Sequence, residues 1–476
     1  MSKRITVKLS AMPKLPKINF TPCSYKGPSL EAIGTIRQNN VNPIMKPLYK
    51  KPLLLHQGYM QWLFDNDGKR YLDMFGGICT VSVGHCHPKV TDAAFNQWNK
   101  LVHTSSLFQH PKLYEYSQKL ADKMPGDLKV VYLLNSGSEA NDLAILLARL
   151  YTGNNEILSL KNCYHGMSYQ TMGLTSLANY KYKVVPPPAI HNVMNPDVFR
   201  GIWGGSNCRD SLAQTSRHCS CREKECEACD NYIRMLKSEF QSTVGPGKLA
   251  GFFAESIQGV GGAVQFPRNY IKEAYKIVKE NNGLFISDEV QTGIGRTGDH
   301  FWGFESHGIL PDIVTMAKGI GNGFPMSAVV TTKEIATTLT TGSHINTFGG
   351  NPIASAVGLA VLDIIEEEQL QENSKEVGSF LITELDKMRK RFPNIGDVRG
   401  KGLMIGVEMV ENDGKMTPMS PTNFDDLLDK CREMGLILGV GGYNRNVIRL
   451  KPPMCITKED ASFALEVIEK ALKSQL

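Results

Sequence analysis

Residues 284–298 read LFISDEVQTGIGRTG, and this stretch decides between two interpretations of the fold. Its first half is an apolar run that ends in two carboxylates, Asp288 and Glu289. Its second half, GIGRTG (293–298), matches the G-x-G-x-x-G pattern of a dinucleotide-binding turn. Such a turn should join a strand directly to a helix, but DEVQT intervenes here and no helical stripe follows. We therefore predict a buried strand that ends at Asp288 and regard the glycine pattern as incidental.

Short apolar runs of the same kind recur along the middle of the chain. They read VVYLLN (130–135), EILSL (156–160), GFFAES (251–256) and IVTMA (313–317). Runs of this length suit strands that are covered on both faces. Helical patterns separate them, such as the single apolar stripe of residues 269–283. Strand–helix alternation over residues 112–365 predicts an α/β fold with a mostly parallel, doubly wound central sheet.

The chain has a different character outside this region. Residues 60–77 have the pattern of two short strands around the turn Asn66-Asp67-Gly68. After about residue 366 the sequence becomes rich in charged helical patterns, and strand patterns return at 402–410 and 446–453. We therefore predict a smaller α+β domain over residues 366–476.

Composition and charge exclude several functions. The chain has 476 residues, of which 42% are apolar and 21% charged, as in globular proteins. It has no uncharged apolar run of about eighteen residues, so we expect no membrane span. The net charge of +6 equals the six basic residues among the first thirty, so the rest is neutral and gives no electrostatic argument for nucleic-acid binding. The basic segment 1–35 predicts a poorly ordered targeting segment and a mitochondrial location.

A lysine follows one of the predicted strands, where open α/β sheets bind their ligands. Lys318 comes directly after the run 313–317 and precedes three glycines within five residues. An amine among apolar and glycine neighbours is poorly solvated, which lowers its pKa, as a Schiff-base lysine requires. Taken alone, the same lysine would fit an exposed loop.

Two further strand ends carry polar groups. In LLNSGSEANDLAILLARL (133–150), Ser136 and Glu139 form a capping box. Gly137 and Ser138 leave the first-turn N–H groups accessible, which suits a phosphate. Tyr164 and His165 follow the strand 156–160, where an aromatic ring could stack on a planar ligand. The stripe behind the capping box consists of Leu143, Leu146, Leu147 and Leu150.

Together these features describe a ligand with a phosphate, an aromatic face, a ring nitrogen that pairs with a carboxylate, and an aldehyde that reacts with a lysine. Pyridoxal 5'-phosphate has all four. Asp288 would keep the ring nitrogen protonated, and Lys318 would hold the aldehyde as a Schiff base. Once substrate has displaced it, the free amine of Lys318 would act as the general base for the proton at the substrate Cα.

The motifs SGSEAND, YHG, ISDEVQTGIGRTG, MAKGIGNGFP and NTFGGNP stand in the order and spacing of the class III, fold-type I aminotransferases. The chain resembles this family over roughly residues 40–470. The resemblance implies a large cofactor domain over 112–365, and an N-terminal segment, 36–111, that packs with the small domain. It also implies an active site shared between the subunits of a homodimer, while a homotetramer of two such dimers stays open.

The resemblance gives each matching residue a role. The implied phosphate ligands are Gly137, Ser138 and, from the neighbouring subunit, Thr347. The implied cofactor-ring contacts are Tyr164, which stacks, Asp288 at the ring nitrogen, Gln291 at the ring hydroxyl, and Glu255 beside the cofactor. Lys318 is the implied Schiff-base lysine. Arg449 is implied to bind the substrate carboxylate with two parallel hydrogen bonds.

One departure from the family pattern concerns the substrate. Several members that use ω-amino acids read E-P-I-Q-G-E, and the last glutamate pairs with the arginine. Residues 255–260 read ESIQGV here, so Val260 cannot neutralise Arg449, and Ser256 replaces the usual proline. We therefore expect alanine or a small β-amino acid as the donor and glyoxylate or another 2-oxo acid as the acceptor, in a ping-pong cycle in the mitochondrial matrix.

Parts of the sequence also fit other functions. A β-alanine or 3-aminoisobutyrate–pyruvate transaminase is the alternative within the family. A phospholyase is disfavoured because Arg449 is kept and no second basic cluster is available for a substrate phosphate. An NAD-dependent dehydrogenase rests only on the GIGRTG pattern, and an inactive binding protein would leave Lys318 and Asp288 without a role.

Five of the eleven cysteines lie in one insertion, residues 207–231. Cys219, Cys221, Cys226 and Cys229 could supply four thiolates to zinc. Their spacing is not that of a standard zinc finger. We therefore expect free thiols or a redox-labile pair rather than a metal site.

Overall fold

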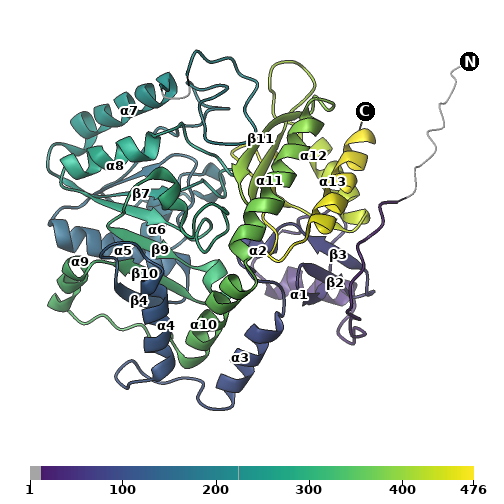
Figure 1. Ribbon diagram of the computed structural model, residues 1–476, viewed down its shortest axis with the longest axis horizontal. Coiled ribbons are helices and arrows are strands. Elements are labelled where there is room, and N and C mark those ends of the chain that lie inside the picture. The colour runs from purple at the N-terminus through teal and green to yellow at the C-terminus, as the bar shows by residue number, and fades with distance from the viewer. Residues whose placement is uncertain (1–11, 45, 223–224, 476) are drawn as a thin grey trace, which may run out of the picture.

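Figure 1 shows the computed structural model, which describes residues 12–44, 46–222 and 225–475. A seven-stranded sheet, called the large sheet below, forms its centre in the order β4-β10-β9-β8-β7-β5-β6. Its strands are β4 (Val130–Leu134), β5 (Glu156–Leu160), β6 (Ile190–Val193), β7 (Leu249–Glu255), β8 (Leu284–Asp288), β9 (Ile313–Met316) and β10 (Ser327–Thr331). All five apolar runs quoted above are strands of this sheet.

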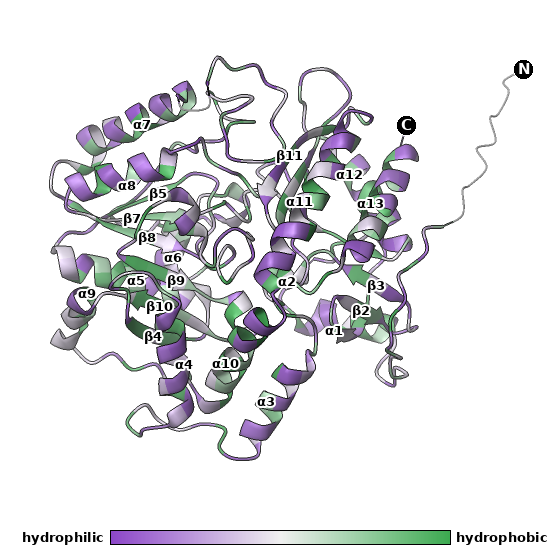
Figure 2. Ribbon diagram, viewed as in Figure 1, coloured by the Kyte–Doolittle hydropathy of each residue, from purple (hydrophilic) through white to green (hydrophobic). Residues whose placement is uncertain are grey.

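The large sheet is mostly parallel, as predicted. Strands β9, β8, β7, β5 and β6 pair in parallel, whereas β10 pairs antiparallel with both β9 and β4. Phe252 of β7 packs in a cluster with α7 (Glu227–Glu239) and α8 (Tyr270–Glu280), but Phe253 packs with α5 (Gly137–Thr152). Successive side chains of a strand point to opposite faces, so helices cover both faces and the sheet is doubly wound. Figure 2 shows apolar residues concentrated in its strands.

Helix α5 departs from its prediction in two details. Ser136 Oγ accepts the Glu139 N–H at 3.2 Å, but the Glu139 carboxylate accepts the N–H of Asn135, at 2.9 Å, one residue before the expected capping-box position. In the predicted leucine stripe, Leu143 and Leu147 are buried, whereas Leu146 and Leu150 are each 42% exposed. The stripe is therefore wrong at two positions. Ala140, Ala144 and Ala148 complete the buried face, because small side chains let the helix approach the sheet closely.

The C-terminal part of the chain forms a second, antiparallel sheet in the order β11-β12-β15-β14. Its strands are β11 (Ile395–Lys401), β12 (Met404–Met409), β14 (Gly439–Gly441) and β15 (Val447–Leu450). The helices of this part are α11 (Leu370–Arg389), α12 (Pro421–Glu433) and α13 (Lys458–Lys473). These elements lie beside the large sheet in Figure 1 and have the predicted α+β character.

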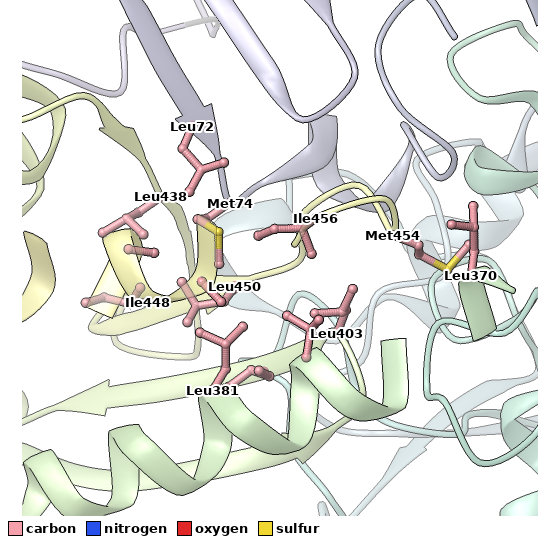
Figure 3. Close-up of a cluster of buried hydrophobic side chains, with 14 of the residues drawn as sticks. Leu72, Met74, Leu370, Leu381, Leu403, Leu438, Ile448, Leu450, Met454 and Ile456 are labelled. Carbon is pink, nitrogen blue, oxygen red and sulfur yellow. The ribbon is translucent and has the colours of Figure 1, made fainter. Parts of the chain in front are cut away.

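A third sheet joins the two ends of the chain. It has the order β1-β2-β3-β13, with β1 (Leu55–Tyr59), β2 (Trp62–Asp65), β3 (Arg70–Asp73) and β13 (Leu436–Ile437). The predicted strand pair around residues 66–68 is thus confirmed, and β13 pairs with β3 in parallel. Figure 3 shows the core below this junction, where Leu72 and Met74 approach Leu438 and Leu450. The N-terminal strands therefore share one hydrophobic core with the C-terminal part.

The remaining helices connect these sheets. They are α1 (Leu30–Asn40), α2 (Gly76–Cys79), α3 (Pro88–Trp98), α4 (Pro111–Asp122), α6 (Tyr169–Leu174), α9 (Lys333–Thr337) and α10 (Pro352–Glu367). Helix α10 runs across the predicted boundary at residue 366, and the domain boundaries stay predictions. No helix in the described part of the chain is both long and apolar enough to cross a membrane.

Residues 12–29 carry no helix or strand but pack against the core. Phe20 stacks on Tyr59 with ring centroids 4.4 Å apart, and Leu15 and Ile18 pack on the same cluster. Arg70 Nη2 donates a hydrogen bond to the Pro16 carbonyl at 2.6 Å. These residues therefore differ from the poorly ordered segment expected over 1–35. The basic residues Lys3, Arg4 and Lys8 of the predicted targeting segment lie outside the described residues.

Candidate active site

A cavity with about 450 Å³ of empty space lies at the carboxyl ends of β7 and β8, beside the N-terminus of α5. Its walls include the predicted residues Gly137, Ser138, Tyr164, Glu255, Asp288, Gln291 and Lys318. The cavity therefore brings together side chains that lie up to 181 positions apart in the sequence. Thr347 and Arg449 do not line it.

Asp288 is the last residue of β8 and is 3% exposed. Its Oδ2 accepts hydrogen bonds from His165 Nδ1 at 2.7 Å and from Asn141 Nδ2 at 2.9 Å. Its Oδ1 accepts the Val290 N–H at 3.0 Å. Burial would raise the pKa of Asp288, but the hydrogen bond and charge of His165 hold it below the ordinary value. The cavity thus contains an ionised carboxylate at neutral pH, as a protonated ring nitrogen requires.

His165 is a functional residue whose contact the sequence did not predict. Its ring is fully buried and its Nε2 has no hydrogen-bond partner among the described residues. Burial opposes the imidazolium, yet the nearby Cys163 and Asp288 raise the pKa of His165 well above its usual value. His165 therefore acts on the ligand site through Asp288, whose charge it stabilises.

Lys318 follows β9 and opens a short 3-10 turn, Lys318–Gly321. Its φ of +48° lies in the left-handed region, which is unusual for a residue with a side chain and occurs often at functional sites. Burial lowers the pKa of its amine, as the sequence predicted. Its Nζ has no hydrogen-bond partner among the described residues, so a free amine and a carboxylate line the same cavity. This pair fits the aldehyde and the ring nitrogen of pyridoxal phosphate.

The N-terminus of α5 forms the end of the cavity that suits an anion. Gly137 and Ser138 are its first two residues, and the N–H groups of a helix start attract anions. Ser138 Oγ accepts the Met167 N–H at 3.1 Å. Gly166 packs directly over it with a φ of +128°, and a Cβ there would lie 2.5 Å from Ser138 Oγ. A side chain at position 166 would therefore collide with Ser138 at the start of α5.

Glu255 and Tyr164 form one positioned unit. Glu255 is the last residue of β7 and pairs in register with Asp288 on β8. Its Oε1 accepts the Tyr164 N–H at 3.1 Å and its Oε2 accepts the Gly259 N–H at 2.6 Å. Burial raises the pKa of Glu255. The carboxylate thus fixes the backbone that carries Tyr164, whose half-buried ring lines the cavity.

Gln291 is oriented by a lysine that the sequence analysis missed. Lys451 is fully buried and its Nζ donates to Gln291 Oε1 at 2.9 Å and to the Gly259 carbonyl at 3.3 Å. Since the amide oxygen accepts from the lysine, the amide N–H groups remain available to the cavity. Burial lowers the pKa of Lys451 to about 7. In VIRLKPP, Lys451 stands two residues after Arg449, the spacing of one strand face, and that spacing could have revealed it.

Arg449 lies on β15 and is 4% exposed. Its Nε donates to the Val440 carbonyl at 2.8 Å and its Nη1 to the Gly259 carbonyl at 3.3 Å. It forms no ion pair with a carboxylate in the described part of the chain. Its guanidinium is near enough to Lys318 to lower the pKa of that amine further. Arg449 is thus a buried cation that no carboxylate of the described residues neutralises.

The second carboxylate of the opening stretch has a structural role. Glu289 accepts hydrogen bonds from Ser256 Oγ at 2.6 Å, Thr292 Oγ1 at 2.8 Å and the Gly303 N–H at 2.8 Å. Ser256, which replaces the usual proline, is thus a donor to a buried acid. Arg296 of the glycine-rich turn donates to the Leu403 and Pro452 carbonyls and ties the large sheet to the C-terminal part. The only regular element within residues 290–312 is a short 3-10 helix, Gly303–His307, so the turn lacks the helix of a dinucleotide site.

The fold and this set of side chains define a pyridoxal-phosphate-dependent transaminase. A family model described as "Aminotransferase class-III" matches residues 45–472, and the chain belongs to this family. The sequence is similar to "Alanine--glyoxylate aminotransferase 2, mitochondrial" of Homo sapiens, with 50% identity over 471 residues that cover 99% of this chain and 91% of the human one.

Solved structures agree with this assignment. An (S)-enantioselective omega-transaminase from Thermomicrobium roseum matches with a TM-score of 0.84 and 30% identity, over 95% of this chain and 100% of that one. An amine transaminase from an uncultivated Pseudomonas species, solved in a PLP-bound form, matches with a TM-score of 0.80 and 28% identity, over 92% and 98% of the chains. The predicted fold type, enzyme class and cofactor are therefore confirmed.

Proposed function

We propose that this transaminase moves an amino group from alanine, or a small β-amino acid, to glyoxylate or another 2-oxo acid. The observation that carries the proposal is Arg449, a buried cation that has no carboxylate partner among the described residues. A planar guanidinium binds a carboxylate with two parallel hydrogen bonds. The name of the human relative specifies the same pair of substrates.

Each residue of the cavity has a distinct role in the proposed reaction. Pyridoxal phosphate, when bound, supplies the electron sink that makes the substrate Cα acidic. The Asp288 carboxylate holds a proton on the ring nitrogen, and the N–H groups of Gly137 and Ser138 hold the phosphate. Lys318 Nζ takes the proton from the substrate Cα, because burial leaves a larger share of its amine unprotonated.

Residues of the C-terminal part orient the substrate. Arg449 binds the carboxylate group and so places the Cα toward Lys318. Lys451 Nζ donates a hydrogen bond to the Gln291 amide oxygen, so the amide N–H can donate to the ring hydroxyl. The two half-reactions are balanced: alanine becomes pyruvate as its nitrogen is taken up, and glyoxylate becomes glycine as the nitrogen is delivered.

A small β-amino acid suits the same site with pyruvate as acceptor. Its carboxylate lies one carbon further from the amine and would meet the same guanidinium. The two activities are compatible in one enzyme.

We also propose that the active site is completed by a second copy of the chain. Thr347 is exposed in a loop outside the cavity, which suits contact with a neighbouring subunit. The same loop exposes Ile345 and Phe348, and the loop after α3 exposes Leu107 and Phe108, with exposures of 62–80%. Apolar side chains grouped in this way mark interaction surfaces. A homodimer that buries this surface would place Thr347 at the partner's phosphate site, and pairing of two such dimers gives a homotetramer.

For location we propose the mitochondrial matrix. The basic, acid-free N-terminus has the bias of a targeting segment, and the human relative is named mitochondrial.

A donor panel tests the proposed reaction. Alanine, β-alanine, 3-aminoisobutyrate and ornithine are compared by kcat/KM with glyoxylate and with pyruvate as acceptors. We expect alanine with glyoxylate to give the highest value, and the β-amino acids to work with pyruvate. Ornithine or a long ω-amine working far better than alanine would contradict the proposal.

A further inference from the structure

Four cysteine sulfurs converge beside α7, on the face of the large sheet that carries α8. Cys208 Sγ lies 3.1 Å from Cys219 Sγ and 3.6 Å from Cys221 Sγ, and Cys221 Sγ lies 3.9 Å from Cys226 Sγ. The sulfurs of Cys208, Cys221 and Cys226 all lie within 4.8 Å of one another. All four cysteines are free thiols.

These separations match a tetrahedral metal site. Zinc binds thiolates at about 2.3 Å, which places the four sulfurs of a tetrahedron about 3.8 Å apart. The Cys208–Cys221 and Cys221–Cys226 separations of 3.6 and 3.9 Å lie close to that value, whereas the Cys208–Cys219 separation of 3.1 Å would have to lengthen. The four ligands come from three turns of the insertion, so one ion would fix all of them at once.

The ligand set differs from the one the sequence suggested. Cys208, eleven residues before Cys219, takes the place expected for Cys229. Cys229 is buried in α7, three residues after Cys226. Like Cys219, it lies outside the group of three sulfurs within 4.8 Å of one another, but Cys219 Sγ lies 3.1 Å from a member of that group, Cys208. A spacing argument could not find Cys208, because the chain between it and Cys219 is a loop without a fixed geometry.

One of the four sulfurs lies where a thiolate is favoured. Cys226 is the N-cap residue of α7, a helix of 13 residues, whose first turn carries the positive end of the helix dipole. The Cys221 N–H points at Cys219 Sγ at 3.2 Å. Cys208 and Cys226 are buried, while Cys219 and Cys221 are half-buried. Three sulfurs thus converge, and Cys219 Sγ, 3.1 Å from Cys208 Sγ, would have to shift toward the other two to complete the four ligands of a structural zinc site.

We propose that Cys208, Cys219, Cys221 and Cys226 bind one zinc ion. Four thiols lose four protons to solvent as Zn²⁺ binds, which leaves a tetrathiolate centre with a net charge of −2 and no open coordination position. No redox change takes place.

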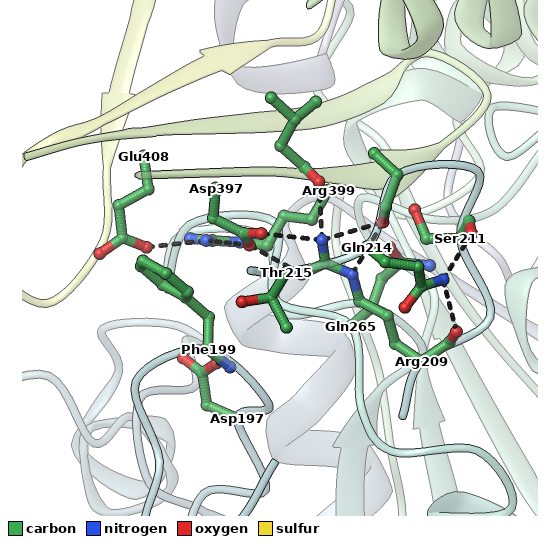
Figure 4. A network of polar contacts seen from close by, with 12 residues as sticks. Asp197, Phe199, Arg209, Ser211, Gln214, Thr215, Gln265, Asp397, Arg399 and Glu408 are labelled. Carbon is green, nitrogen blue, oxygen red and sulfur yellow. Dashed lines mark hydrogen bonds and ion pairs between the residues drawn. The ribbon is translucent and has the colours of Figure 1, made fainter. Parts of the chain in front are cut away.

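The ion would fix the loop that carries Arg209 into the C-terminal part. Arg209 follows Cys208 directly, and its guanidinium donates to Asp397 Oδ2 at 2.7 Å and Oδ1 at 2.8 Å. Figure 4 shows this pair inside a network that continues through Arg399 to Glu408. The Cys208 carbonyl also accepts the Arg268 N–H at 2.7 Å. The zinc site therefore anchors a bridge between the insertion and β11, away from the cofactor cavity.

Metal analysis of the full-length, cofactor-loaded enzyme, purified without chelator or added metal, tests the proposal. We expect one zinc per chain by elemental mass spectrometry. Cys208→Ser and Cys226→Ser should each lose most of it. Cys229→Ser is the matched control, since it removes a buried thiol from the same insertion and should keep one zinc per chain.

A second measurement applies if a serine variant does not fold. Wild-type protein produced in zinc-depleted medium with Co²⁺ should show visible bands of tetrahedral cobalt–thiolate coordination at long wavelength, apart from the cofactor absorption. The proposal is overturned if wild-type protein lacks stoichiometric zinc and all four thiols react freely or pair as disulfides. It is also overturned if Cys229→Ser loses the metal while Cys208→Ser retains it.

Discussion

His165 Nδ1 lies 2.7 Å from Asp288 Oδ2, and both side chains are buried at the inner end of the cofactor cavity. This contact holds the charge of Asp288, the residue that we propose faces the ring nitrogen. Without it, burial would favour the neutral carboxylic acid, which cannot stabilise a protonated ring. Under the proposed function, the protonation of the cofactor ring would depend on His165 through its contact with Asp288.

Replacing His165 should weaken the cofactor's hold on the enzyme. In His165→Phe, burial raises the pKa of Asp288 because the largest opposing group is gone. Cofactor affinity should fall about tenfold or more, since a hydrogen bond to a charged group contributes about 1.5–3 kcal/mol. In the variant it should fall further as the pH drops through the raised pKa, whereas the wild-type enzyme keeps its affinity to lower pH. Titration of the apoenzyme with pyridoxal phosphate across pH measures both effects.

The matched control is His191→Phe, which removes a partly exposed histidine paired with Glu156 outside the cavity. It should bind cofactor as the wild type does. An unchanged dissociation constant and pH profile in His165→Phe would contradict the role given to this contact.

Lys451 should give carboxylate binding a pH dependence near neutrality. Its pKa is lowered to about 7 by burial, so the amine is charged below that pH and neutral above it. A second cation near Arg449 strengthens carboxylate binding, so inhibition by propionate should be tighter below pH 7 and weaker above it. Loss of this charge should change the inhibition constant by roughly 1 kcal/mol or more, about fivefold.

Lys451→Met should abolish this pH-dependent limb, while Lys401→Met, whose amine pairs with Asp210 outside the cavity, should retain it. The comparison uses the inhibition constant of propionate from pH 6 to 9. The interpretation fails if the pH dependence of the inhibition constant persists in Lys451→Met.

Val260→Glu should move the enzyme toward amine substrates. Val260 follows Gly259, whose carbonyl accepts a hydrogen bond from Arg449 Nη1 at 3.3 Å. A carboxylate next to it in the sequence would compete with the substrate for the guanidinium. We expect kcat/KM for alanine to fall by about tenfold or more, equivalent to about 1.4 kcal/mol, while long ω-amines gain relative to alanine. Val260→Gln, of similar size but uncharged, is the control, and an equal loss in both variants would count against the charge argument.

The buried pair of Arg209 and Asp397 should matter for stability. Both side chains are fully buried, and Arg209→Met removes two of the hydrogen bonds to Asp397, which keeps one to Arg399. Breaking such a pair costs about 3–5 kcal/mol of unfolding free energy. The urea concentration at half-denaturation of the holoenzyme should fall accordingly. Lys50→Met removes an exposed pair with Asp426 and should cost less than about 1 kcal/mol, so equal shifts in the two variants would refute the distinction.

Much of the fold could be predicted because buried parallel strands have a simple signature. Five of the seven strands of the large sheet were visible as short apolar runs, and the chemistry was sought where those runs end. Strand β6 was missed because Ile190–Val193 carries the polar pair His191-Asn192, and β10 because Ser327–Thr331 follows a glycine-rich loop without a clear break. Leu146 and Leu150 show that periodicity locates a helix face less reliably than it locates the helix.

The site was predicted at the level of residues but not of contacts. Asp288 and Lys318 each follow a strand, so the sequence alone brought them to one edge of the sheet. The hydrogen bond between His165 and Asp288 joins residues 123 positions apart, and no local pattern encodes it. The sequence alone could not exclude Glu289 and Ser256 from the catalytic residues. Their structural role becomes evident only from the hydrogen bond between their side chains.

Covalent capture of the cofactor tests the central claim most directly. Borohydride treatment of the purified enzyme, followed by peptide mass spectrometry, should place the reduced cofactor on Lys318. Lys318→Ala should show neither this modification nor turnover. Lys451 is the rival, because burial lowers the pKa of its amine as well. Cofactor on Lys451, or a Lys318→Ala enzyme with full activity, would contradict the account.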